Sequence, residues 1–124
     1  MASILRVNTL TDASSNNSTA MSTINQGTAK AWVAGEADAI RSDSFNMSGS
    51  TDHGDGDFSY NLSSSFATLH YAQSGIVETN ASAAKTLLRH TDRHSTSVIA
   101  VELVNASGTN KNYDHDVLAH GDLA

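Results

Sequence analysis

Hydrophobic and polar residues alternate with a period of two along most of the chain. The alternating segments are Ser3–Leu10, Ala20–Ile24, Thr28–Ala34, Leu69–Val77, Ala84–His90, Ser95–Val104 and Tyr113–Ala119. Successive side chains of a strand point to opposite faces, so this period predicts β-strands. Turn residues such as Gly, Asn, Asp and Ser separate the segments, and no segment has the pattern of a convincing helix.

The clearest single unit is a hairpin between Ser44 and Ser64. Phe45 and Met47 share one face of its first strand, and Phe58 begins an alternating return strand. The connection between them, Gly49–Asp57, is rich in Gly and Asp. Apolar positions at spacing two on both sides of such a loop are typical of a β-hairpin with a long connection.

The most apolar segment, Ser95–Val104, is predicted to be a central strand. It has hydrophobic residues on both faces, and such strands are usually covered on both sides. The predicted core residues are Phe45, Phe58, Tyr60, Ile99, Val101 and Leu103. Seven or eight short strands with turns between them predict an all-β antiparallel sandwich over residues 20–124, with an extended N-terminal arm over residues 1–19.

The amino-acid composition indicates that the hydrophobic core is small. Leu, Ile, Val and Phe together supply 24 of 124 residues, whereas Ser, Thr and Asn supply 40. Small chains with thin cores often gain stability by oligomerising, so we expect an oligomer, with a homotrimer preferred. The net charge of −6 and the scattered Lys and Arg argue against a nucleic-acid surface, and no apolar run is long enough to span a bilayer.

Two groups of residues are candidates for metal binding, and the sequence favours a structural role for both. Asp52–Asp57 places carboxylates next to glycines, as calcium loops do, but the closing Glu of a twelve-residue calcium loop is missing. His90 and His94 share one face without a third ligand at a motif spacing. We therefore expect no metal and no cofactor. No G-x-S-x-G elbow is present, and we expect no enzyme activity.

Several stretches resemble a known class of proteins. These are residues 2–33 (ASILRVNTLTDASSNNSTAMSTINQGTAKAWV), residues 40–46 (IRSDSFN), residues 51–58 (TDHGDGDF) and the tail with Val117 and Gly121-Asp122. They are similar to small tail fibre and tail structural proteins of tailed bacteriophages, many from phages of cyanobacteria. The resemblance implies a non-enzymatic virion protein at the tail fibre or baseplate that contributes to host attachment. A capsid head decoration or cement protein is the alternative.

For such a protein we expect contacts with the host in loops. The two favoured loops are Thr51–Asp57 and Asn105–Asn112, because both are expected to be long, polar and flexible and both would sit on a rigid sheet. The candidate contact residues are Thr51, Asp52, His53, Asp55, Asp57, Asn110, Lys111 and Asn112. The expected partners are other phage tail or baseplate proteins and a host surface glycan. The alternative is that both loops are ordinary connections.

Overall fold

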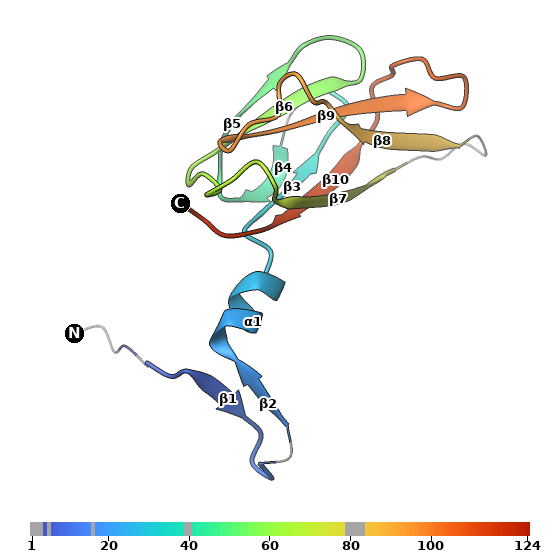
Figure 1. The fold of residues 1–124 in the computed structure, drawn as a ribbon. Coiled ribbons are helices and arrows are strands. Elements are labelled where there is room, and N and C mark those ends of the chain that lie inside the picture. The colour runs from blue at the N-terminus through green and yellow to red at the C-terminus, as the bar shows by residue number, and fades with distance from the viewer. Residues whose placement is uncertain (1–3, 5, 16, 39–40, 79–83) are drawn as a thin grey trace.

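The computed structural model describes residues 4, 6–15, 17–38, 41–78 and 84–124 (Figure 1). Within these residues, eight strands form two four-stranded antiparallel sheets that pack face to face. A small hairpin and one short helix precede the two sheets. The predicted all-β sandwich is therefore confirmed.

Each sheet combines consecutive strands with strands distant in sequence. The first sheet has the order β4 (Arg41–Phe45), β3 (Ala31–Gly35), β10 (His115–His120) and β7 (Ala72–Val77). The second sheet has the order β5 (Met47–Asp52), β6 (Asp57–Leu62), β9 (Val98–Asn105) and β8 (Lys85–Arg89). β9 pairs with both β6 and β8, so the most apolar segment is an internal strand, as predicted.

The core lies between the two sheets and is formed by alternate residues of their strands. The second sheet contributes Phe58, Tyr60, Ile99, Val101 and Leu103, all fully buried, which are five of the six predicted core residues. The first sheet contributes Ala31, Val33, Val117 and Ala119. Inward-facing side chains of two packed sheets interdigitate in this way in β-sandwiches.

The sixth predicted core residue, Phe45, is 53% exposed, and its prediction is wrong. The predicted single strand breaks at Asn46, which has a positive φ of 60°. Its side-chain amide donates to the carbonyls of Lys30 and Ser64, at 3.0 and 2.9 Å, and so fixes a corner between the sheets. Phe45 therefore ends β4 in the first sheet, whereas Met47 begins β5 in the second and packs against the core.

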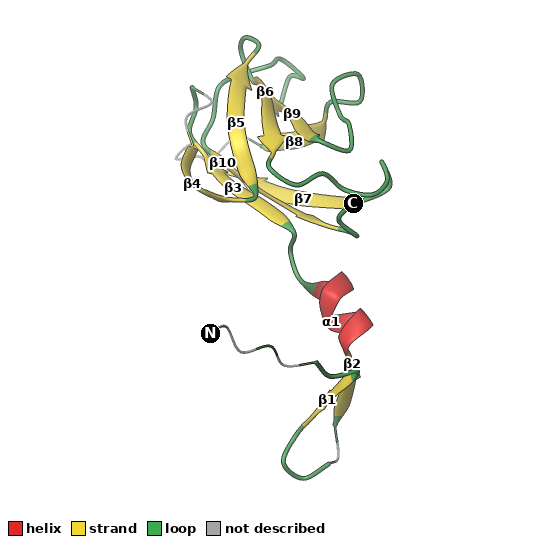
Figure 2. Ribbon diagram, turned by 90° about the vertical axis from the view of Figure 1, so that its left-hand side faces the viewer, coloured by secondary structure: helices red, strands yellow, loops and turns green. Residues whose placement is uncertain are grey.

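The described residues before Lys30 form no strand of either four-stranded sheet, and we call residues 1–30, up to the start of β3, the N-terminal extension. It contains a hairpin of β1 (Thr9–Thr11) and β2 (Ser18–Ala20), followed by α1 (Met21–Gly27). Figures 1 and 2 show the hairpin and helix projecting from one end of the sandwich. Every described residue between 4 and 20 is exposed. The domain boundary expected between residues 19 and 20 remains a prediction. Helix α1 follows that boundary in the chain and also lies outside both four-stranded sheets.

Helix α1 replaces the strand predicted over Ala20–Ile24. Met21 and Ile24 are three residues apart, so a helix places them on one face, and both are partly buried. Thr28 ends the helix by donating its backbone N–H and its hydroxyl to the carbonyl of Ile24, at 3.0 and 2.6 Å. A five-residue apolar pattern fits either period, so the sequence could not distinguish helix from strand here.

Candidate functional site

The two loops proposed as contact loops lie side by side, at the end of the sandwich far from the N-terminal extension (Figures 1 and 2). Gly56 of the β5–β6 loop donates its N–H to Oδ1 of Asn112 at 2.6 Å and accepts from the N–H of Leu103 at 2.7 Å. Lys111 in turn donates its N–H to the carbonyl of Leu103 at 3.0 Å. The structure thus joins into one surface two loops that the sequence proposed separately.

Glycine is required at position 56 for this junction. Gly56 has a φ of 66°, in the left-handed region that disfavours side chains. A Cβ there would lie 2.5 Å from the carbonyl oxygen of Leu103 and 2.6 Å from the amide nitrogen of Lys111. The two loops can therefore approach so closely only because residue 56 lacks a side chain.

Gly56→Ala is expected to destabilise the fold far more than Gly108→Ala. Both glycines have a positive φ, and Gly108 has no atom within 4 Å of the added Cβ. Gly108→Ala should cost only the left-handed strain, about 1–2 kcal/mol. Gly56→Ala should add about 1–3 kcal/mol of steric overlap. Urea denaturation of both variants measures the difference, and equal losses would show that the loops do not meet at Gly56.

Each loop is also shaped by short-range hydrogen bonds. Oδ1 of Asn105 accepts from the N–H groups of Ser107 and Thr109, at 2.9 and 3.0 Å. Oδ1 of Asp52 accepts from the N–H of Gly54 at 2.8 Å. Asn and Asp side chains commonly stabilise turns in this way. The loops therefore have defined conformations that hold their exposed side chains in place.

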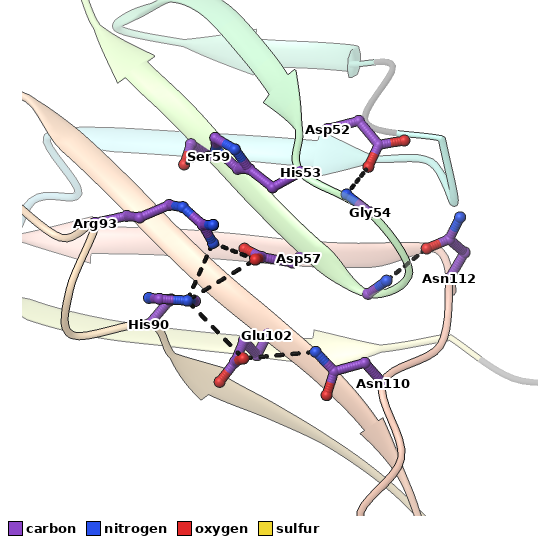
Figure 3. Close-up of polar contacts among 11 residues, drawn as sticks. Asp52, His53, Gly54, Asp57, Ser59, His90, Arg93, Glu102, Asn110 and Asn112 are labelled. Atoms are coloured by element: carbon purple, nitrogen blue, oxygen red, sulfur yellow. Dashed lines mark hydrogen bonds and ion pairs between the residues drawn. The ribbon is translucent and has the colours of Figure 1, made fainter.

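A polar cluster lies on the outer face of the second sheet, next to the β5–β6 loop (Figure 3). We call Asp57, His90, Arg93 and Glu102 the Asp57 cluster. Arg93 forms an ion pair with Asp57 and donates to Nε2 of His90 at 3.0 Å. The same His90 nitrogen lies 3.8 Å from Asp57 and 3.9 Å from Glu102. Sequence reasoning missed this cluster, because its members are brought together only by strand pairing.

The predicted contact residues divide into two kinds. Asp57 and Asn110 are partly buried, with Asp57 paired to Arg93 and Asn110 3.5 Å from Glu102, so they hold the loops rather than present a surface. The other six are exposed, and we call them the contact surface: Thr51, Asp52, His53, Asp55, Lys111 and Asn112. Thr51 and Asp52 end strand β5, so the predicted loop is shorter than expected and begins at His53. They offer a hydroxyl, carboxylates, an imidazole, an ammonium group and an amide.

The contacts of the Asp52–Asp57 loop favour a structural role for its carboxylates over calcium binding. The carboxylates of Asp52 and Asp57 do not converge, because one bonds the N–H of Gly54 and the other pairs with Arg93. Among the described residues, no group of three or more His, Asp or Glu could hold a metal ion. A Ser–His contact exists between Ser59 and His53 at 2.8 Å, but Ser59 is only 6% exposed, which hinders approach of a substrate.

His115 belongs to the core, although Asp114 and Asp116 flank it in the sequence. It is 1% exposed and stacks on Phe58, with ring centroids 5.2 Å apart. Its Nε2 accepts from the Tyr60 hydroxyl at 2.6 Å, and its Nδ1 donates to the Tyr113 carbonyl at 2.9 Å. Burial lowers the pKa of His115 because the charged form is poorly solvated there.

Comparisons with known proteins do not identify a function for this chain. The chain matches no protein-family model, no curated protein and no solved structure. Within the described residues, no helix has the length and apolar character needed to cross a membrane. The fold, the N-terminal extension and the contact surface are the observations from which a function can be proposed.

Proposed function

We propose that this protein is a structural protein of a bacteriophage virion, at the tail fibre or baseplate, that contributes to host attachment. The observation that carries the proposal is the placement of two features at opposite ends of the sandwich. The N-terminal extension leaves one end, and the joined loops with the contact surface form the other (Figure 2). This arrangement suits a protein held by one end while the other faces outward.

The N-terminal extension supports attachment to other subunits of the particle. Its hairpin has three residues in each strand, and all six are exposed. A two-stranded hairpin by itself is at best marginally stable in water. Packing against another protein would supply the missing burial. Other tail or baseplate proteins are the partners we propose, together with further copies of this chain in a homotrimer.

The contact surface supports recognition of a host surface glycan. Glycans are bound largely through hydrogen bonds, and the contact surface displays charged and uncharged polar groups at the end of β5 and on the two loops beside it. In an oligomer with parallel subunits the same surface recurs in every copy. Weak contacts of single copies would then add through multivalency.

A head decoration protein is the second candidate, and the exposed N-terminal extension favours it equally. An extension of this kind could lie across capsid subunits instead of binding a tail or baseplate. The two candidates differ in where the protein sits on the particle. Labelling the protein in intact particles and imaging them by electron microscopy distinguishes a tail position from a head position.

Thr51→Ala/Asp55→Ala is expected to weaken binding of the oligomer to host cells by about tenfold or more. The change removes two exposed polar side chains from the contact surface, and each lost hydrogen bond is worth about 0.5–1.5 kcal/mol. The matched control is Thr91→Ala/Asp92→Ala, the same pair of changes at exposed residues of another turn. Binding of fluorescently labelled protein to host cells measures both. Equal binding by the two variants would show that these loops are only connectors.

A further inference from the structure

The outer face of the first sheet is apolar and exposed. Trp32 of β3 lies in register with Phe45 of β4 on one side and Leu118 of β10 on the other. Phe45 is 53% exposed, Leu118 37%, and Ile76 of the neighbouring β7 62%. We call these four residues the apolar face. Contiguous exposed apolar surface is typical of interaction sites.

A groove crosses this face, and it combines apolar walls with negative charge. It has a volume of about 530 Å³ and is lined by Trp32, Ile76, Leu118 and Asp116, among others. Asp116 and Asp43 are the register partners of Ala34, so two carboxylates stand in the row beside Trp32. A fitting partner would therefore supply apolar side chains together with a positive charge.

The N-terminal extension of this same chain has that character. Ile4, Val7 and Leu10 are 75%, 37% and 46% exposed, and the exposed Arg6 lies among them. The charged residues of positions 1–30 are Arg6, Asp12 and Lys30, which gives the extension a net charge of +1. Since the whole chain carries −6, residues 31–124 carry −7. Arg6 and the apolar residues on either side of it therefore match the apolar face and the two carboxylates beside Trp32.

We propose that the N-terminal extension of one copy binds the apolar face of a second copy. Helix α1 has seven residues and is about 10 Å long, and it carries the hairpin away from its own sandwich (Figure 1). The four residues of a second apolar face include no cation for Asp116 and Asp43, whereas the N-terminal extension offers Arg6. A stable interface uses about 20–30 residues a side, a number that the extension can supply.

This contact is heterologous, because a different surface of each copy takes part. Such contacts form closed rings when the rotation between copies closes, and a trimer is one such ring. The inference deepens the proposed function by naming the protein that the extension binds first. The contact between two copies needs no other component of the particle. It can therefore be tested on the isolated full-length chain, and its result does not depend on the proposed virion role.

The absence of cysteine from the sequence allows a direct test by cross-linking. Val7→Cys and Leu118→Cys are made as separate full-length variants, mixed at micromolar concentration and treated with a short thiol-specific cross-linker. We expect a covalent dimer joining one copy of each, identified by mass spectrometry. The matched control replaces Leu118→Cys by Leu88→Cys, at a residue 43% exposed on β8 of the other sheet. The mixture of Val7→Cys and Leu88→Cys should give no more covalent dimer than random collisions in solution produce.

Sedimentation velocity of the full-length protein supplies the second measurement. Leu118→Asp should convert the oligomer to monomer, whereas Leu88→Asp should leave it unchanged, with both variants folded by circular dichroism. Three results would overturn the inference: a monomeric wild type, Leu118→Cys copies that cross-link mainly to each other, or equal sedimentation of the two aspartate variants. The first points to another protein as the partner of the apolar face, and the second to packing of two such faces.

Discussion

Val101→Asp is expected to leave the chain unfolded. Val101 is fully buried on β9, in register with Phe58 of β6, and belongs to the core between the two sheets. Burying a carboxylate without a partner costs at least several kcal/mol. That cost is comparable with the whole stability of a small domain, about 5–15 kcal/mol. Circular dichroism and urea denaturation measure the result.

Val104→Asp is the matched control for this change. It is the same substitution on the same strand, but Val104 has the opposite parity and is only partly buried. The carboxylate can reach water there, so we expect a folded protein with a loss of about 1 kcal/mol. An unchanged melting temperature for Val101→Asp, or equal unfolding of both variants, would show that the inner face of β9 is not the centre of the core.

Alternation of residues predicted most of the sandwich strands because a strand with one covered face must bury every second side chain. It predicted the core residues of β6 and β9 for the same reason. It failed at Phe45, because a corner at Asn46 moves the chain to the other sheet without interrupting the alternation. Alternation also cannot tell which face of a strand stays uncovered, so the exposure of Leu118 and Ile76 was not foreseen.

The candidate site was predictable as two loops but not as one surface. Turn residues mark each loop in the sequence, whereas the hydrogen bond from Gly56 to Asn112 joins residues 56 positions apart. The Asp57–Arg93 pair likewise joins residues 36 positions apart. Such contacts depend on the pairing of β6 with β9, which a single sequence does not reveal. The same pairing places Asp57 beside Glu102, where Asp57 forms an ion pair with Arg93 instead of facing a partner.

Deletion of residues 1–19 is expected to abolish incorporation of the protein into phage particles while leaving the sandwich folded. Every described residue of this stretch is exposed, so its loss should change the melting temperature little. It contains Ile4, Val7 and Leu10, the exposed apolar residues through which we expect it to bind other subunits. Circular dichroism checks the fold, and quantitative mass spectrometry of purified particles measures incorporation.

The most direct test of the proposed virion role is the number of copies per purified particle for three forms of the chain. The full-length protein and Thr51→Ala/Asp55→Ala should be incorporated equally, because the contact surface lies at the end away from the N-terminal extension. The form lacking residues 1–19 should be absent. Incorporation of that shortened form at the full-length level, or absence of the full-length protein from particles, would contradict the account.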